Sequence, residues 1–287
     1  MTSTRLLLAG YEGEPEGSPD TPILLGALRE AGFDAQLAPW REASAEDYDL
    51  CLLHTTWDYA WHPQAFDSWL ASWGSRLVNP LELVRWNSHK GYLAELSAQG
   101  IPVVPTVSAR RGERLDLAQA AAQQGWEELV LKPAIGQGAR ETLRARASDL
   151  RELQAHADKL LQTEDVLLQP FLPSILAWGE RSLMMIDGIC THAIHKRSAA
   201  GDWRVQSEFG GSVELVEATQ EERAVARQAL ALTPEPALYA RVDLVQHAGQ
   251  PCVIELELVE PELFLPSFPG AATTLSEALR THVQGQA

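Results

Sequence analysis

The sequence is poor in cysteine and in basic residues. Its three cysteines, Cys51, Cys190 and Cys252, are far apart and show neither metal-ligand spacing nor an even number. This argues against a disulfide framework or a structural zinc site, and it indicates reduced thiols in a cytoplasmic protein. Lys and Arg together number 23 against 39 Asp and Glu, so the net charge is −16. Such a charge repels phosphate backbones and anionic lipid, which makes nucleic acid and membrane poor partners, although a local basic pocket can still attract a small anion.

Long apolar runs are also missing. No run reaches the ~20 residues of a transmembrane helix. The N-terminal segment MTSTRLLLAGYEGEPEG has only a short apolar run before an acidic loop, so we expect no targeting segment. The 287 residues, 45% of them apolar, are enough for two or three compact units with a sizeable core.

Predicted strands alternate with predicted helices over the first part of the chain. The runs RLLLAG, FDAQLAP and YDLCLLHTT have the composition of strands. A helix is expected to begin at Asp20 or Thr21, with Pro22 in its first turn, and PQAFDSWLASW is also helical in pattern. Strands separated by helices indicate a parallel α/β sheet.

The rest of the chain carries antiparallel signals. Strands are expected at ELVLKP and DVLLQPFL, and GERSLMMIDGICTHAIHK is typical of a hairpin that turns at residues 187–188. YARVDLV and PCVIELELV are expected to pair across the turn HAGQ. Thr219 with Glu222, and Thr274 with Glu277, have the spacing of helix capping boxes. The long polar segment RSAAGDWRVQSEFGG is typical of a lid or binding loop.

The stretch VIELELVEP places carboxylates on a strand that is otherwise apolar. Side chains alternate between the two faces of a strand, so Glu255 and Glu257 point the same way. Asp243 lies on the preceding strand, and the HAGQ turn can bring it to the same face. The side chains expected on the opposite, core-facing side are Ile254, Leu256 and Leu258.

Three converging carboxylates repel one another, so at least one takes up a proton unless a cation lies between them. Oxygen ligands without nearby His or Cys suit Mg²⁺ or Mn²⁺, and Mg²⁺ usually completes its shell with phosphate oxygens and water. The alternative is a solvent-facing strand with ordinary surface glutamates. The strand alone leaves both interpretations open.

Lysines and glycines upstream suggest a phosphate site. Lys132 ends the strand LVLKP, and Gly136 and Gly138 follow in a loop whose backbone N–H groups can approach an oxyanion. The loop matches neither a Walker A motif nor a Rossmann fingerprint. The alternative is a glycine hairpin with a surface lysine, and Lys90, at the start of an upstream helix, can equally be an ordinary surface lysine.

A third basic group lies in and next to the long polar segment. Lys196, Arg197 and Arg204 are concentrated there, although the whole chain has only 23 basic residues. Such a group opposite acidic metal ligands suits an anionic reacting centre. A solvated loop is the alternative.

Taken in order, these motifs resemble the ATP-grasp superfamily. Along the chain, the first motifs are a lysine after an α/β domain and a strand that leads through Lys-Pro into a glycine loop. A hinge strand and a glutamate follow. The last motifs are an arginine loop with a Gly-Gly pair and the terminal pattern Asp…Glu-x-Glu. The resemblance covers nearly the whole chain and implies an α/β and α+β protein with the ATP-grasp fold. The implied units are an N-terminal parallel α/β domain and two α+β lobes that clamp ATP, at residues 1–86, 87–172 and 173–287.

The resemblance also implies roles for individual residues. It implies contacts of Lys90 and Lys132 with the ATP phosphates, next to the glycine loop, and of Glu180 with the ribose. The implied adenine segment is Gln169, Pro170, Phe171 and Leu172. The implied metal ligands are Asp243, Glu255 and Glu257, and the implied catalytic residues are Arg204, Lys196 and Lys132. Two positions depart from the pattern, because Glu257 stands where relatives often have Asn, and Gln169 where an acidic residue is usual.

A narrower resemblance comes from TTWDY, WNSHKGYL, KPAIGQGARET and ELELVEPELFL. These segments are similar to the glutathione-synthetase-like branch that includes the O-ureido-serine cyclo-ligase of cycloserine biosynthesis, which activates the carboxylate of O-ureido-D-serine and closes a ring. The implied activity is ADP-forming: ATP converts a carboxylate into an acyl phosphate, which an amine or amide nitrogen attacks. A small-molecule kinase and a nucleotide-binding module without turnover are the alternatives.

The substrate itself is expected to be small and amino-acid-like, and homo-oligomer formation stays open. Its contacts are expected from residues 11–20 and 55–59, which follow strand ends in the first domain. Glu260 is a weaker candidate for contact with a substrate amino group. His54 and His195 receive no role, because a lone His in a strand is more often a satisfied core residue.

Overall fold

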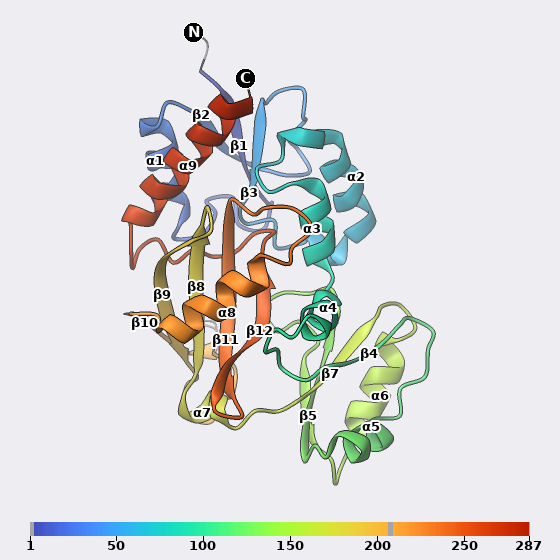
Figure 1. The fold of residues 1–287 in the computed structure, drawn as a ribbon. Coiled ribbons are helices and arrows are strands. Elements are labelled where there is room, and N and C mark those ends of the chain that lie inside the picture. Colours follow the sequence, from blue (N-terminus) through green and yellow to red (C-terminus); the bar gives the residue numbers. More distant parts are fainter. Residues whose placement is uncertain (1–2, 206–208, 287) are drawn as a thin grey trace.

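Three β-sheets, which follow one another along the described residues, form the framework of the protein (Figure 1). The computed structural model describes residues 3–205 and 209–286. The first sheet is parallel, in the order β2-β1-β3, as the alternation of strands and helices predicts. Its strands are β1 (Arg5–Gly10), β2 (Asp34–Pro39) and β3 (Leu50–Leu53).

Helices cover both faces of this first sheet because alternate residues of β1 are apolar on both sides. Leu6 and Leu8 face one core, whereas Leu7 and Ala9 face a second core with Trp40, Phe66 and Trp73. The helical elements of this region are α1 (Thr21–Glu30), η1 (Tyr59–Trp61), α2 (Pro63–Trp73), η2 (Gly74–Arg76) and α3 (Leu81–Ser88).

The second sheet is antiparallel, in the order β4-β7-β5-β6. Its elements are α4 (Tyr92–Ala98), β4 (Val107–Ala109), α5 (Leu117–Gln124), β5 (Glu128–Pro133), β6 (Leu143–Arg146), α6 (Arg151–Leu160) and β7 (Val166–Pro170). Leu129 and Leu131 of β5 pack with residues of α5 and α6 in one core. Since side chains alternate along a strand, Lys132 points to the opposite face of the sheet, away from that core.

The third sheet is antiparallel, in the order β10-β9-β8-β11-β12. Its elements are α7 (Ser174–Ala177), β8 (Glu180–Ile186), β9 (Ile189–Arg197), β10 (Ser212–Val216), α8 (Gln220–Leu230), β11 (Tyr239–His247), β12 (Gln250–Glu257) and α9 (Gly270–Gln286). The hairpin at Asp187 and Gly188 is confirmed, with φ of 48° and 73° at these residues. The capping box of Thr219 and Glu222 is confirmed as well.

The second capping box was expected wrongly. Helix α9 already begins at Gly270, so Thr274 lies inside it, and the Thr274 hydroxyl donates to the carbonyl of Gly270 at 3.2 Å. The segment PSFPG ends at the first residue of α9, so the helix starts there and not at the later position that the sequence pattern indicates.

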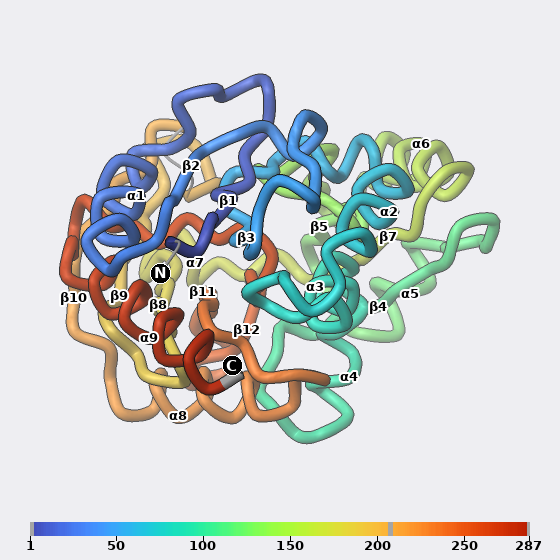
Figure 2. The backbone as a smooth tube through the Cα atoms, turned by 90° about the horizontal axis from the view of Figure 1, so that it is seen from above, coloured from blue at the N-terminus to red at the C-terminus, as the bar shows by residue number. Residues whose placement is uncertain are grey.

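The last helix joins the third part of the chain to the first. In Figures 1 and 2, α9 lies beside α1, and both termini lie at the same end of the molecule. One core contains Leu24 of α1, Met184 of β8 and Leu275 of α9. The N-terminal sheet is therefore fixed to the third sheet by shared packing. The domain boundaries at residues 86 and 172 stay a prediction.

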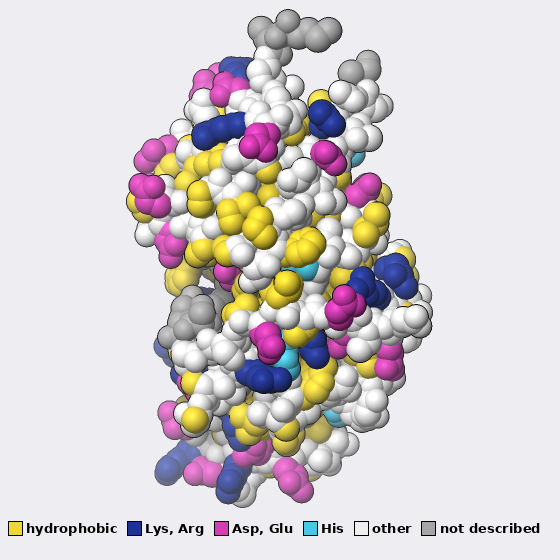
Figure 3. Space-filling view, turned by 90° about the vertical axis from the view of Figure 1, so that its left-hand side faces the viewer, with side chains coloured by type: hydrophobic (Ala, Val, Ile, Leu, Met, Phe, Trp, Pro, Cys, Tyr) yellow, Lys and Arg dark blue, Asp and Glu magenta, His cyan; other side chains and the backbone are white. Residues whose placement is uncertain are grey.

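Charged side chains are distributed over the surface. On the face in Figure 3, Lys and Arg side chains are scattered among Asp and Glu. Over residues 3–205 and 209–286, no helix is long and apolar enough to cross a membrane.

Candidate active site

Two carboxylates of the third sheet lie directly opposite each other. Asp243 of β11 pairs with Glu255 of β12, so the turn between these strands sets the register that the sequence predicts. A β-bulge follows Asp243, and it shifts the alternation of β12. As a result Val253, rather than Ile254, packs in the core together with Leu256. The expectation for Ile254 was wrong because a bulge leaves no clear signal in the sequence.

Buried side chains hold β12 at the edge of its sheet. The amide of Asn87 donates to Leu256 O at 2.9 Å, and Leu258 N donates to the Asn87 oxygen at 2.7 Å. The Tyr92 hydroxyl donates to Leu256 O at 3.0 Å and accepts from Leu256 N at 2.9 Å. These bonds satisfy backbone groups that an edge strand otherwise leaves unpaired, and they fix the strand that carries Glu255 and Glu257.

Lys90 and Lys132 are the cations next to Glu255. Lys90 Nζ lies 3.0 Å from Glu255 Oε1 and donates to Gly136 O at 2.5 Å. Burial lowers the pKa of Lys132, and the neighbouring Glu255 acts in the opposite direction. The two lysines and the glycine loop expected at a phosphate site are therefore together at the end of β12.

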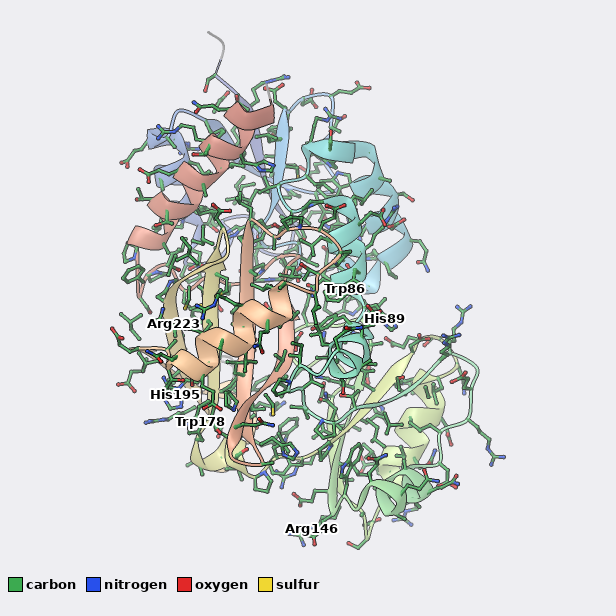
Figure 4. The ribbon with its side chains drawn as sticks, in the orientation of Figure 1. Trp86, His89, Arg146, Trp178, His195 and Arg223 are labelled. Atoms are coloured by element: carbon green, nitrogen blue, oxygen red, sulfur yellow. The ribbon has the colours of Figure 1, made fainter. Side chains whose placement is uncertain are left out.

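The turn before α4 fixes Lys90. Its backbone N–H donates to Ala134 O at 2.8 Å, next to the glycine loop. The preceding residue, His89, lies 3.1 Å from Asp165 through Nε2, and its Nδ1 accepts from Gly91 N at 3.0 Å. Figure 4 shows His89 at this turn, beside Trp86.

A second group of charges surrounds Asp243. Lys196 Nζ lies 2.8 Å from Glu180 Oε1 and 3.6 Å from Asp243 Oδ2. Arg241 pairs with Asp243 at 2.9 Å and also with Glu257. Burial opposes ionisation of Asp243, but Arg241 and Lys196 outweigh it and lower the pKa of this carboxyl. Burial raises the pKa of Glu257 to about 7, with Asp243 and Glu255 adding to the shift and Arg241 opposing it.

Arg241 is a site residue that the sequence interpretation missed. It lies two residues before Asp243 on β11, so both side chains share a face, and both are buried. The ring of Phe264 lies 5.5 Å from Lys196 Nζ and 5.8 Å from the Arg241 guanidinium carbon. The i, i+2 spacing of Arg241 and Asp243 in YARVDLV was the available signal.

The chemistry of these carboxylates fits a divalent cation. All three donors are oxygen ligands, which suit Mg²⁺, and repulsion from Asp243 and Glu255 adds to the burial that raises the pKa of Glu257. Within residues 3–205 and 209–286, however, no group of three His, Cys, Asp or Glu side chains is placed to hold a metal. The carboxylates instead contact Lys90, Lys196 and Arg241, so a metal there would have to displace at least part of these ion pairs.

The three basic residues expected on the long polar segment lie in different places. Lys196 is buried in β9, where the expected hairpin places it, whereas Arg197, expected in the polar segment, is the last residue of that strand. Arg204 pairs with Asp202 at 2.8 Å and lines a cavity of about 510 Å³ with Trp203 and β6. The structure thus brings Lys196, but not Arg204, into contact with the carboxylates. Residues 206–208 of this loop are outside the described part of the chain.

The expected adenine segment lies at the end of β7. Gln169 is buried, and its amide donates to the Thr106 hydroxyl at 2.9 Å. Phe171 N donates to Glu128 O at 2.9 Å, and the Arg144 guanidinium carbon lies 3.4 Å from the centre of the Phe171 ring. The backbone N–H of Phe171 is therefore engaged, whereas Pro170 has none to offer.

Both histidines without an assigned role have structural hydrogen bonds. His54 Nε2 lies 2.7 Å from the Thr21 hydroxyl, and burial lowers the pKa of His54 to about 4. Figure 4 shows His195 beside Trp178, and His195 Nε2 contacts the carbonyl oxygen of Trp178. These contacts fit satisfied structural histidines.

Two family models match the chain. Residues 6–79 match the N-terminal domain of D-cycloserine synthetase DcsG, and residues 102–250 match the ATP-grasp domain of prokaryotic glutathione synthetase. The chain belongs to the ATP-grasp family. The family and the fold that the motif order predicts are confirmed.

Relatives cover most of this ATP-grasp chain. Cycloserine biosynthesis protein DcsG of Streptomyces lavendulae is 33% identical over 276 residues, which are 91% of this chain and 92% of that protein. Glutathione synthetase of Parasynechococcus marenigrum is 30% identical over 179 residues, 60% of this chain and 54% of that protein.

Solved structures share the ATP-grasp fold. The crystal structure of D-cycloserine synthetase DcsG is similar with a TM-score of 0.88 at 31% identity, over 97% of this chain and 99% of that chain. D-alanine–D-alanine ligase from Bacillus anthracis, complexed with ATP, has a TM-score of 0.67 at 18% identity over 99% of both chains. The second likeness concerns the fold alone.

Proposed function

We propose that the protein is an ATP-dependent, ADP-forming ligase that activates a small amino-acid-like carboxylate for attack by a nitrogen atom. The observation that carries this proposal is the placement of Lys90 and Lys132 beside Glu255, with Asp243 opposite and the glycine loop adjacent. One site would thus supply cations for a triphosphate and oxygen ligands for its metal ion. Membership of the ATP-grasp family supports the same reaction class.

The phosphate end of the nucleotide is assigned to Lys90, Lys132 and the N–H groups around Gly136 and Gly138. Glu180 is assigned to the ribose. For the adenine, Pro170 can offer its carbonyl and Leu172 its N–H, because Phe171 N is already bonded to Glu128. Asp243, Glu255 and Glu257 would hold magnesium, which neutralises phosphate charge and keeps the γ-phosphoryl group aligned.

The reaction needs an activated carboxylate, because a free carboxylate has no adequate leaving group. Transfer of the γ-phosphoryl group to a carboxylate oxygen gives an acyl phosphate, and the nitrogen nucleophile then displaces phosphate. Positioning and charge stabilisation supply most of the catalysis of phosphoryl transfer. Arg241 and Lys196, buried beside Asp243, would stabilise the transferring group. Arg204 can join them only if its loop moves toward the sheet.

The nitrogen can belong to the same molecule as the carboxylate, and then the product is a ring. The relative with 33% identity over 91% of the chain is a cycloserine biosynthesis protein, which makes O-ureido-D-serine the first substrate to test. A ligase that joins two separate molecules is the other form of the same chemistry.

The test is a coupled assay of ADP and phosphate release with Mg²⁺ and a panel of amino acids that includes O-ureido-D-serine. We expect one carboxylate to stimulate ADP release, and Glu255→Gln to reduce the rate at least ~100-fold, the usual cost of losing a charge-stabilising group at such a centre. Glu277→Gln, on the exposed face of α9, is the matched control and should retain activity.

Two results would contradict the proposal: substrate-dependent release of AMP, or normal turnover by the Glu255→Gln variant. Product analysis separates the remaining possibilities. A new amide or ring identifies a ligase, whereas a stable phosphorylated product identifies a kinase.

A further inference from the structure

A bulky residue with a left-handed backbone lies beside two buried cations of the candidate active site. Phe264, in the segment between β12 and α9, has φ of +51°, a region that residues other than glycine rarely adopt. The residue is buried, with 9% of its surface exposed. Such a conformation costs free energy and persists only where the surrounding structure imposes it. The neighbours of Phe264 must therefore hold its backbone in place.

Asp20 supplies the main constraint on this backbone. Its carboxylate, at the start of α1, accepts from Leu263 N at 2.6 Å and from Leu265 N at 2.7 Å. The two bonds fix the chain immediately before and immediately after Phe264. Asp20 is fully buried, and within the described parts of the chain its side chain makes no capping bond to α1. The carboxylate therefore serves the distant segment and not its own helix.

Two further bonds tie the same segment to the third sheet. Arg241 Nη1 donates to Glu262 O at 3.2 Å, and His192 Nε2 donates to Leu263 O at 2.9 Å. Arg241 belongs to β11 and His192 to β9, the two strands that flank β8. The segment is therefore held between α1 on one side and the third sheet on the other.

The ring of Phe264 contacts both cations. It lies 5.5 Å from Lys196 Nζ and 5.8 Å from the Arg241 guanidinium carbon, within the range of a cation–π interaction. Both cations also pair with Asp243. Lysine and arginine side chains have many rotamers, and a single partner leaves much of that freedom. The ring adds a second contact to each cation and so limits both to positions beside Asp243.

We propose that Asp20 and Phe264 form a clamp that positions Lys196 and Arg241 for transfer of the γ-phosphoryl group. Asp20 fixes the backbone of residues 263–265, and the Phe264 ring holds the two cations. Both members of the clamp are positioning residues, because they act through the cations. The inference rests on the proposed function, which supplies the negative charge that the cations stabilise. It adds that a carboxylate at the start of α1 controls the rate of the chemical step.

The clamp should affect kcat more than the binding of ATP. Stabilisation of a transferring phosphoryl group depends on charges that are already in place, and a displacement of about 1 Å can cost about 100-fold in rate. Glu180, which is assigned to the ribose, belongs to β8 and does not contact the ring through any printed sheet position that the substitution changes. Loss of the ring should therefore lower kcat and leave KM for ATP nearly unchanged.

The experiment measures ADP release against ATP concentration for the wild-type protein, Phe264→Leu, Asp20→Asn and the double variant, with the carboxylate that the substrate panel identifies. Phe264→Leu removes the ring but keeps a side chain at φ of +51°, and it should lower kcat at least ~10-fold with KM for ATP within about twofold. Asp20→Asn replaces one acceptor oxygen by an NH₂ donor and should lower kcat at least ~5-fold.

The double variant tests whether Asp20 acts through Phe264. Without the ring the backbone of the segment has nothing left to position, so kcat of the double variant should lie within about twofold of that of Phe264→Leu. Independent effects would instead multiply to about 50-fold or more. If Asp20→Asn does not fold, Asp20→Glu, which keeps both oxygens but shifts them by one methylene group, takes its place with the same expectation.

Leu279→Ala is the control for loss of stability alone. Leu279 is fully buried in the same core as Phe264, but it is apolar and lies on α9. This variant should keep the wild-type kcat once rates are divided by the folded fraction, which circular dichroism measures at the temperature of the assay. A fall in kcat that Leu279→Ala reproduces would assign the effect to the packing of the core and overturn the clamp.

The outcomes separate the clamp from the proposed function. A wild-type protein that releases no ADP with any carboxylate contradicts the proposed function, and the clamp with it. ADP release whose kcat is unchanged in Phe264→Leu, or effects of the two substitutions that multiply, overturn the clamp alone. A rise in KM for ATP at unchanged kcat does so as well, because it would place the ring in nucleotide binding.

Discussion

Gly179 is the glycine whose replacement should disturb the site most directly. It has φ of +81° and lies between Trp178 and Glu180, immediately before β8. A β-carbon at this position would lie 2.2 Å from the backbone oxygen of Lys196 and 2.9 Å from His195 Nε2. The first contact is with backbone, so no side-chain rotation can relieve it, and β8 and β9 must move apart where Glu180 pairs with Lys196.

The cost of Gly179→Ala follows from two terms. Placing alanine in the left-handed region costs about 1 kcal/mol. Overpacking against a rigid neighbour adds about 1–3 kcal/mol, which gives a total loss of stability of about 2–4 kcal/mol. Gly188→Ala is the matched control, because Gly188 has φ of +73° in a hairpin turn and no atom lies within 4 Å of the added carbon. It should lose only the conformational term, about 1 kcal/mol.

Urea denaturation with equal m-values measures the loss of stability in both variants. KM for ATP reports whether Glu180 and Lys196 keep their places. Gly179→Ala should lower the free energy of unfolding more than Gly188→Ala and should raise KM for ATP, while Gly188→Ala leaves KM unchanged. Equal losses of stability in the two variants, within about 0.5 kcal/mol, would refute the reasoning.

Three further predictions concern the buried polar residues. Burial raises the pKa of Asp20 to about 6, so the folded state keeps a proton that the unfolded chain releases near pH 4. The stability that this proton contributes is present at low pH and is lost as the pH rises through 6. The wild-type protein and the Asp20→Asn variant are therefore compared in unfolding free energy, and the value for wild type minus that for the variant should fall by about 1 kcal/mol from pH 5 to pH 7. Arg241→Leu leaves Asp243 and Glu257 without their strongest cation, so the variant should lose about 3 kcal/mol of stability without metal. It should recover part of that loss when Mg²⁺ and ADP are added, and thermal denaturation measures both effects. Asn87→Leu leaves the N–H of Leu258, next to the end of β12, without its partner, while Leu256 O keeps the Tyr92 hydroxyl. The variant should lose about 1–3 kcal/mol in urea denaturation, and an unchanged stability would contradict the role given to this side chain.

Local patterns predicted much of the framework. The hairpin of β8 and β9, the pair β11 and β12, and the capping box at Thr219 depend on near neighbours in sequence, and all are confirmed, whereas β10 was not expected. The pairing of Asp243 with Glu255 was predictable because a short turn sets the register of two adjacent strands. The bulge after Asp243 and the extension of β9 to Arg197 were not predictable, because neither changes the alternation enough to be read from composition.

Contacts between distant residues could not be predicted in this way. Asp20 was expected at the start of a helix, where an aspartate usually caps. Its carboxylate instead accepts from Leu263 N at 2.6 Å and Leu265 N at 2.7 Å, more than 240 positions along the chain. The contacts of Arg204 could not be predicted for the same reason, since they depend on how a long loop folds over the second sheet.

The most direct test of the central claim is the fate of a carboxylate oxygen. O-ureido-D-serine labelled with ¹⁸O in its carboxylate is converted with ATP and Mg²⁺, and the released phosphate is examined by mass spectrometry. Activation as an acyl phosphate transfers one labelled oxygen to each phosphate. Product formation with unlabelled phosphate, or with the label in AMP, would contradict the account.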